Sequence, residues 1–251
     1  MICPNCHTEN DISHKFCKEC GYAFKNTISH VHLINADLLE KEGDFNKAIE
    51  EYQKALSADE SNIKIRSHLA ELYEQYNMVD KAIEQYVILK EHNPLYADVH
   101  YKLGTLYYRT NKTNDAIREY RAAISINPQY KSAHYQLGIV LYHLGKLEEA
   151  VYHFKEVLRI SPDYLLAHYQ LGVTYERMQK DEEAIQEFQK VVRGTPEDAA
   201  AHYHLGVAFY NKNMIKNAIH EFTIAVKLNP KDFASKRNLD LLKSMTSYET
   251  T

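Results

Sequence analysis

The chain has 251 residues, of which 45% are apolar and 25% are charged, and this composition is typical of a globular protein. Its net charge of −4 argues against a general nucleic-acid binder, because such proteins carry an excess of Lys and Arg that neutralises phosphates. The sequence contains no apolar run of about 18 residues and no secretion signal, so we expect a cytoplasmic protein without a membrane span.

All four cysteines lie before residue 21, in the pattern C-x2-C-x10-C-x2-C, at Cys3, Cys6, Cys17 and Cys20. Thiolates are strong zinc ligands, and four of them close a tetrahedral structural site. In a reducing compartment, clustered cysteines indicate a metal more often than disulfides. The segment resembles the short zinc ribbons at the N-termini of many bacterial and archaeal proteins. The resemblance implies a ribbon over residues 1–24 that holds a structural Zn2+ ion.

Several alternatives for this segment stay open. Such ribbons usually have Gly after both cysteine pairs, as at Gly21, whereas His7 follows the first pair, which leaves a mixed Cys/His site as an option. Two disulfides, a redox-active dithiol pair and an iron site are further options. Phe16, Tyr22 and Phe24 are expected to form a minimal core. Because so short a module buries little apolar surface, the metal must supply most of its stability. We expect the ribbon to rest on the helix that follows it.

A repeat with a period of 34 residues fills most of the chain. Five prolines mark it: Pro94, Pro128, Pro162, Pro196 and Pro230. The alignment gives six units: 29–62, 63–96, 97–130, 131–164, 165–198 and 199–232. Counted from the first residue of each unit, position 8 is Ala or Gly, position 20 is Ala, and position 24 is Tyr or Phe in every unit. Position 32 is Pro except in the first unit, where it is Glu60. A period of 34 is typical of helix–turn–helix repeats.

The pattern inside each unit predicts two antiparallel helices, at about positions 2–14 and 17–30, because its apolar residues follow the helical spacing. Small residues at positions 8 and 20 allow the two helices to approach closely. The aromatic residue at position 24 is expected to fill the space between one hairpin and the next. Pro at position 32 ends the second helix. Residues 233–245 predict one more amphipathic helix, whose Leu239, Leu242 and Met245 cover the open end of the sixth unit.

The repeats resemble those of the tetratricopeptide repeat (TPR) family over residues 29–232. This resemblance implies an all-α, right-handed superhelical solenoid of six helix hairpins with a C-terminal capping helix. Position 4, often Trp in the family, is His in the last four units, at His100, His134, His168 and His202. We interpret these histidines as packing residues of the first helix.

In the TPR family, positions 2, 5, 9, 12 and 13 of the first helix line a concave groove that binds partners. The resemblance therefore implies a partner-binding groove in units three to six. Its residues are Tyr101, Tyr108, Arg109, Tyr135, Tyr142, His143, Tyr169, Arg177, Tyr203 and Tyr210. The same positions of the first two units carry acidic residues, namely Asp37, Glu40, Glu71 and Glu74. The predicted groove is thus acidic at one end and aromatic at the other.

The function predicted from these features is that of a non-enzymatic scaffold that binds a segment of a protein or peptide in the groove. A glycine-rich phosphate loop, a paired-acid motif and a nucleophile constellation are all missing from the sequence. Two alternatives stay open. The ribbon could control partner binding in response to metal or oxidant. The partner could also be a second copy of the chain, which would make the protein a self-assembling homo-oligomer.

Overall fold

The structure is a computed structural model that describes residues 2–3, 5–11, 14, 16–22 and 25–248. It divides into two compact parts, which we call the N-terminal part (Met1–Leu106) and the C-terminal part (Tyr107–Thr251). The described residues contain thirteen α-helices and one isolated antiparallel bridge, between Ile2 and Glu9. The all-α class predicted from the repeat is confirmed.

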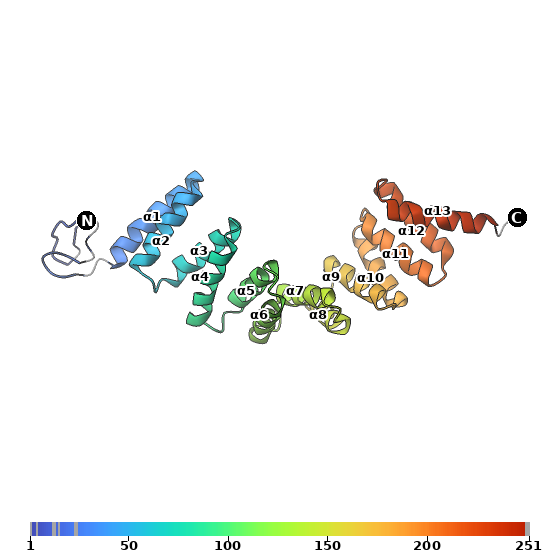
Figure 1. The fold of residues 1–251 in the computed structure, drawn as a ribbon, viewed down its shortest axis with the longest axis horizontal. Helices are drawn as coiled ribbons and strands as arrows, with labels where there is room; N and C mark the ends of the chain where they lie inside the picture. The colour runs from blue at the N-terminus through green and yellow to red at the C-terminus, as the bar shows by residue number, and fades with distance from the viewer. Residues whose placement is uncertain (1, 4, 12–13, 15, 23–24, 249–251) are drawn as a thin grey trace. The chain divides into compact units, whose positions relative to one another are not determined.

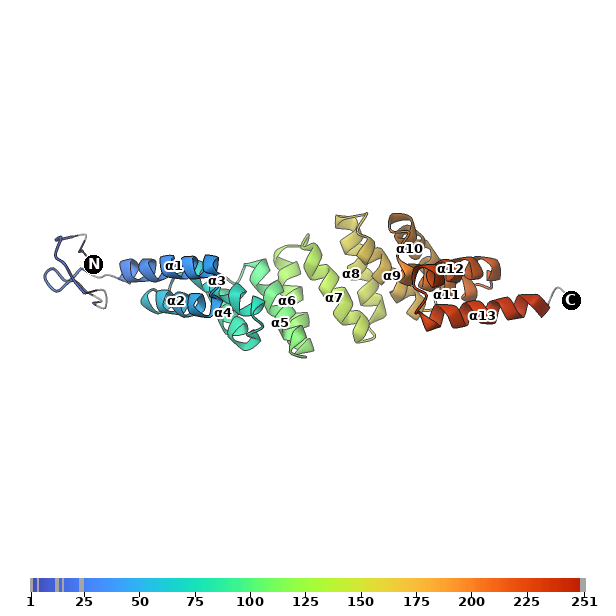
Figure 2. The same cartoon turned by 90° about the horizontal axis from the view of Figure 1, so that it is seen from above.

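The helices follow one another along the chain with short connections between them (Figure 1). Their bounds are α1 (Lys25–Glu42), α2 (Phe45–Ala58), α3 (Ile63–Gln75), α4 (Val79–His92), α5 (Ala97–Arg109), α6 (Thr113–Ile126), α7 (Lys131–His143), α8 (Leu147–Ile160), α9 (Leu165–Arg177), α10 (Asp181–Gly194), α11 (Ala199–Asn211), α12 (Ile215–Leu228) and α13 (Phe233–Tyr248). The first helix of repeats two to six occupies positions 1–13 and the second helix of every repeat occupies positions 17–30. The predicted bounds of these helices were therefore correct to within one residue, whereas α1 begins at Lys25, five residues before its predicted start. Figure 2 shows α1 and α2 side by side, as two helices joined by a short turn must lie.

A left-handed residue ends the first helix of every repeat. It stands at position 15 and its φ lies between 57° and 82° in all six repeats: Gly43, Asn77, Asn111, Gly145, Gln179 and Asn213. The N–H of the next residue donates to the carbonyl at position 11, as from Met78 to Tyr73 at 2.7 Å and from Lys180 to Tyr175 at 2.9 Å. This is the Schellman motif, which favours Gly or Asn at the left-handed position. Gln179 is the residue of the six least suited to it.

The aromatic residue at position 24 packs on the small residue at position 8 of its own hairpin. A Cβ atom added at Gly138, Gly172 or Gly206 would lie 2.7–2.8 Å from the ring of the Phe at position 24, which is closer than real Cβ atoms approach. The rings of Phe188 and His204, in consecutive repeats, stack with centroids 5.4 Å apart. The aromatic residue therefore fills space within its hairpin as well as the expected space between hairpins.

In repeats two to six, a buried side chain at position 4 links the repeat to the loop that precedes it. The Nε2–H groups of His134, His168 and His202 donate to the main-chain carbonyls of Pro128, Pro162 and Pro196 at 2.8–3.2 Å. The other ring nitrogen meets position 23 on the second helix, which is Glu in the pairs His32–Glu51, His168–Glu187 and His202–Glu221. The prediction that the position-4 histidines are packing residues is confirmed by their burial.

Helix α13 occupies the place of the first helix in a seventh repeat. Leu239 and Leu242 are buried as predicted, whereas Met245 is 50% exposed, so its predicted capping role is wrong. The helix extends to Tyr248, three residues beyond the predicted end. In complete repeats, positions 4 and 8 face the second helix, but here they are Lys236 and Asp240, both exposed. This polar side is suited to water, as a terminal cap requires.

No helix among the described residues is both long and apolar enough to cross a membrane.

We predict that Gly172→Ala lowers the free energy of unfolding by about 1–3 kcal/mol, the usual cost of overpacking a core. The added methyl would lie 2.8 Å from the fully buried ring of Phe188, and the ring has no empty space to move into. Urea denaturation followed by circular dichroism measures the effect. In the double variant with Phe188→Leu the cost of the alanine should fall, because the ring atoms that it meets are gone. An unchanged unfolding midpoint for Gly172→Ala alone would contradict this packing.

We predict that Gln179→Gly raises the free energy of unfolding by about 0.5–1 kcal/mol, because glycine adopts φ near +57° without steric cost. The matched control is Gln186→Gly, at an exposed site inside α10. This variant should lower the free energy of unfolding by about 1 kcal/mol. Denaturant melts of the three proteins test both signs. A destabilised Gln179→Gly variant would show that the left-handed turn does not limit stability.

Candidate functional site

The four cysteine sulfurs form a cluster in which all Sγ atoms lie within 4.8 Å of one another. Cys3 Sγ lies 3.6 Å from Cys20 Sγ, and Cys6 Sγ lies 3.5 Å from Cys17 Sγ. Sulfurs at about 2.3 Å from one tetrahedral zinc ion are about 3.8 Å apart, so the cluster fits that ion. The four thiols are free of disulfides. His7 is exposed and lies outside the cluster, which does not support a mixed Cys/His site.

The two cysteine pairs lie in equivalent turns. The N–H of His7 donates to the Cys3 carbonyl at 2.8 Å, and the N–H of Gly21 donates to the Cys17 carbonyl at 3.0 Å. His7 and Gly21 both have left-handed backbones, with φ of 57° and 68°. His7 therefore adopts the conformation of the glycine that usually stands there, and the departure in sequence leaves the turn intact.

Two asparagines that the sequence analysis missed surround the sulfurs. Asn10 is buried, and its side-chain amide donates to Cys17 Sγ at 3.5 Å and to the Thr8 carbonyl at 2.7 Å. Its side-chain oxygen accepts the N–H of Lys18 at 2.9 Å, which links the two cysteine turns. Asn5 donates to Cys20 Sγ at 3.5 Å. Asparagines are common in loops, so the sequence alone gave no signal for this role.

The protein environment acts unequally on the thiols. Burial raises the pKa of the Cys3 thiol to about 11. Burial also opposes ionisation of Cys17, but the N–H groups of Cys20 and Glu19 directed at its sulfur lower its pKa to about 6. Main-chain donors thus favour a thiolate at Cys17, the form in which cysteine binds metal.

The expected aromatic core of the ribbon is not present. Phe16 is 62% exposed and Tyr22 is 40% exposed, and Phe24 lies outside the described residues. The buried centre instead consists of Cys3 and Cys17, and Ile28 of α1 packs against it. Among the described residues of this segment, the buried apolar contacts are thus those of the cysteines and of Ile28.

In the C-terminal part, tyrosines at position 5 form a regular series on the first helices. The rings of Tyr135, Tyr169 and Tyr203 lie 5.9–6.0 Å from the position-24 phenylalanines of their own repeats. All three are half-buried. They therefore support the hairpin, and the rings of Tyr135 and Tyr169 also pack edge-on against Tyr164 and His204, with centroids 5.8 and 5.7 Å apart.

The remaining predicted groove residues differ in exposure and contacts. Arg177 lies over the ring of Tyr142, with Cζ 5.0 Å from the ring centroid, and its Nη1 donates to the Tyr142 carbonyl at 2.9 Å. His143 packs edge-on against Tyr142, with ring centroids 5.5 Å apart. Tyr108 is half-buried and Arg109 is exposed. Tyr101 lies in the N-terminal part and is half-buried.

A cavity of about 250 Å³ lies where α11 meets α13. Its lining is Tyr203, Val207, Tyr210, Asn211, Phe222, Asn238, Leu241 and Leu242. Tyr203 and Tyr210 were predicted groove residues, whereas the three α13 residues were not, because that helix was interpreted only as a cap. Two side-chain amides among apolar and aromatic walls can bind an apolar side chain together with the adjacent peptide backbone.

The acidic end predicted for the groove is largely engaged in internal contacts. The hydroxyl of Tyr52 donates to Asp37 and Glu40 at 2.6 and 2.9 Å. Glu74 pairs with Lys102 of the next repeat at 3.1 Å. Asp37 and Glu40 therefore support the first hairpin, and Glu74 joins the second repeat to the third. The aromatic end remains the stronger candidate for binding.

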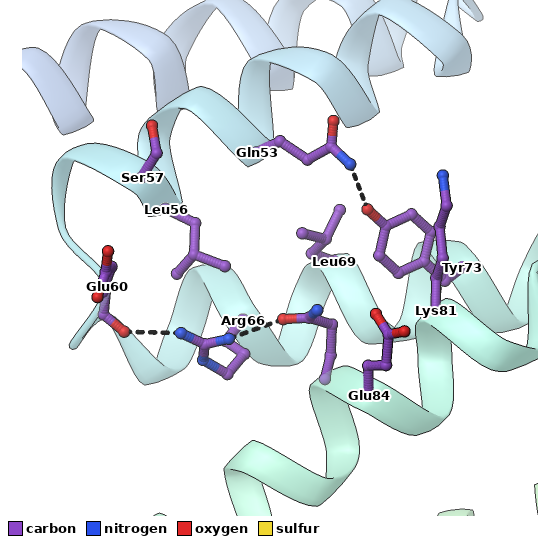
Figure 3. Close-up of a pocket in the computed structure, with 10 residues that line it drawn as sticks. Gln53, Leu56, Ser57, Glu60, Arg66, Leu69, Tyr73, Lys81 and Glu84 are labelled. Atoms are coloured by element: carbon purple, nitrogen blue, oxygen red, sulfur yellow. Dashed lines mark hydrogen bonds between the residues drawn. The ribbon is translucent and has the colours of Figure 1, made fainter.

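A second cavity, of about 330 Å³, opens between α2, α3 and α4 (Figure 3). Its main feature is the buried guanidinium of Arg66, which occupies position 4 and donates to Gln85 and to the Glu60 carbonyl at 2.8 Å each. These are the two contacts that histidine makes in other repeats. Arg66 replaces His at position 4, Gln85 replaces Glu at position 23, and Glu60 replaces Pro at position 32. Together the three residues keep the same two hydrogen bonds, so we assign this cluster to the repeat framework.

Models of the tetratricopeptide repeat family match residues 101–164, residues 39–106 with 144–206, and residues 199–232. Among solved structures, the chain is similar to the MamA protein, at 26% identity over 68% of this chain and 94% of that one, with a TM-score of 0.62. It also resembles YrrB, described as a TPR protein with an unusual peptide-binding site, at 20% identity over 74% and 96%, with a TM-score of 0.67.

PilF of Pseudomonas aeruginosa shares the fold at 16% identity over 85% of this chain and 97% of that one, with a TM-score of 0.65. A comparison with curated proteins finds no match. The second set of family matches alone spans just over half of the chain. On the evidence of its repeat geometry and these matches, the chain belongs to the tetratricopeptide repeat family.

Proposed function

We propose that this protein is a non-enzymatic scaffold that binds a segment of a partner protein on the tyrosine-bearing face of its C-terminal part. The observation that carries the proposal is the cavity between α11 and α13, because it interrupts that face with apolar walls and two amides. Tyr210 is 43% exposed and Leu241 is 51% exposed, so both are accessible to a ligand. YrrB, which shares the fold, is described as peptide-binding, and this supports the choice of ligand.

The proposed partner segment is extended and carries at least one apolar side chain. That side chain would enter the cavity, and the Asn238 amide would bind the adjacent peptide group. The half-buried tyrosines at position 5 would add contact area along the same face. Tyrosine and arginine are favoured at binding hot spots, and the stacked pair of Tyr142 and Arg177 offers both on this face.

We propose further that residues 1–24 form a ribbon stabilised by Zn2+ bound to Cys3, Cys6, Cys17 and Cys20. The ion would cross-link the two cysteine turns. Asn10 would donate a hydrogen bond to Cys17 Sγ, and Asn5 would donate one to Cys20 Sγ. The contact with Ile28 would let the ribbon act as an N-terminal cap of α1. In this proposal residues 29–232 form the six repeats, and residues 233–245 begin the cap at the other end.

The binding face can be tested with a peptide library displayed on phage and selected on the wild-type chain. Selected peptides should carry an apolar residue, and their affinity should fall at least ten-fold for Tyr210→Ala combined with Leu241→Ala. The matched control is Tyr152→Ala, a 58% exposed tyrosine on the second helix of the fourth repeat. Equal losses in both variants, or selected peptides without an apolar anchor, would place binding elsewhere.

The metal centre can be tested through Asn10→Ala, which removes a donor to Cys17 Sγ. Loss of such supporting bonds typically weakens metal binding 10- to 100-fold. Competition for Zn2+ with a coloured chelator measures this, and Glu19→Ala, at an exposed site of the second cysteine turn, serves as the control. Excess chelator should also lower the melting temperature of the wild-type chain. Identical affinities in the two variants would rule out the proposed role of Asn10.

A further inference from the structure

The fourth repeat, like the second, departs from the His–Glu pairing described above, but it does so with two titratable rings. At the positions where repeats one, five and six pair histidine with glutamate, the fourth repeat pairs His134 with His153. Their Nδ1 atoms lie 3.0 Å apart, and the ring centroids are 5.2 Å apart. His134 is 3% exposed and His153 is half-buried.

We propose that the paired imidazoles of His134 and His153 make the fourth repeat an acid-sensitive point of the array. The proposal goes beyond the binding function, because it concerns the stability of α7 on α8. It follows from how many protons the pair can accept before its hydrogen bond is lost.

The hydrogen bonds fix the proton positions of the neutral pair. The Nε2–H of His134 donates to the Pro128 carbonyl at 3.2 Å, so its Nδ1 is an acceptor. His153 must therefore donate through Nδ1–H, and its own Nε2 carries no proton. This arrangement satisfies both rings and uses no charge.

Added protons are poorly accommodated. A first proton can bind His153 at Nε2 without breaking the bond, but it places a charge in a half-buried site. A second proton would turn two N–H donors toward each other across 3.0 Å with no acceptor between them. In the fifth repeat the group that faces the position-4 histidine is the carboxylate of Glu187, which can accept an N–H hydrogen bond.

Two carboxylates near the pair, Glu149 and Glu156, favour protonation of His153, but burial opposes it more strongly. Glu149 of α8 is bound to Arg121 of α6 at 2.9 Å, and Glu156 of α8 is bound to Arg159 at 2.9 Å.

Toward α9, Lys155 lies over the ring of Tyr175, 5.8 Å from its centroid. On the α7 side, Lys131 lies over the ring of Tyr164, 4.7 Å from its centroid. Both lysine ammonium groups thus lie over aromatic rings. Among the described residues, the lysine that pairs with Glu149 is Lys146, at 3.7 Å.

The direction of the pH effect follows from the pKa values. Burial, with His134 and Arg121 adding to it, lowers the pKa of His153 to about 4, and burial also lowers the pKa of His134. Histidine in an unfolded chain titrates near pH 6.5. The opened state therefore binds protons more readily than the folded state, so stability falls as the pH drops from about 7 toward 4.

The test compares the wild-type chain with His153→Glu, which restores the pairing of repeats five and six, and with Glu187→His, which copies the His–His pair into repeat five. Hydrogen exchange of α7–α8 and α9–α10 peptides, corrected for the intrinsic effect of pH, reports opening of each hairpin. Between pH 7.5 and 5.5 we expect opening of α7–α8 to rise about ten-fold more in the wild type than in His153→Glu. In Glu187→His the extra opening should appear in α9–α10.

Each outcome bears on the proposal. Parallel pH profiles in the wild type and His153→Glu overturn it, and so does a His153 ring signal that titrates above pH 6 in NMR. If His153→Glu fails to fold, Glu187→His alone decides, because the absence of new acid sensitivity in α9–α10 also overturns it. Acid effects on the cysteine cluster occur equally in all three proteins and cancel.

Acid opening would also move Tyr135 and Tyr142, which α7 carries, and so weaken partner binding. That consequence rests on the proposed function, whereas the exchange measurements do not. If hydrogen exchange shows the pH effect but no peptide binds, the acid-sensitive pair of the fourth repeat stands and only the proposed binding face is rejected.

Discussion

Repeats two, four, five and six are each anchored by one buried side chain, at position 4, which makes two polar contacts at once. One reaches the carbonyl of position 32 in the preceding repeat, and the other reaches position 23 on the second helix of the same hairpin. A buried carbonyl and a buried side chain would each be costly without a partner, so the two contacts fix the hairpin and its neighbour in register. The aromatic and small residues can pack closely only when this register is kept.

The anchor tolerates different chemistry provided that both contacts survive. Histidine with glutamate, arginine with glutamine, and histidine with histidine all occupy the same places in this chain. The carbonyl of Glu60 accepts a hydrogen bond just as the proline carbonyls do. The periodic proline is thus dispensable for the contact itself, which explains how the first repeat keeps its geometry without it. The side chains at positions 4 and 23 therefore differ among repeats in charge and proton affinity, while the positions of their hydrogen bonds stay the same.

The sequence was sufficient to predict the helices, because a fixed period of 34 residues repeats the same helical spacing six times. It also predicted the four cysteines as one metal-binding cluster, although their spacing left disulfides and a mixed Cys/His site open. It did not reveal the left-handed residue at position 15, because Gly, Asn and Gln there look unrelated until their backbone angles are known. Asn10 and the wall supplied by α13 were missed because both depend on contacts between segments that no short motif records. Phe16 was misassigned because an aromatic residue beside a cysteine pair suggests a core that this ribbon does not have.

The polar side of α13 has a consequence for assembly. A further hairpin could continue the array only by placing its second helix against Lys236 and Asp240, and burying these charges without partners would cost more than the contact returns. The exposed charges of α13 therefore disfavour the addition of a further hairpin by the packing that joins the other repeats.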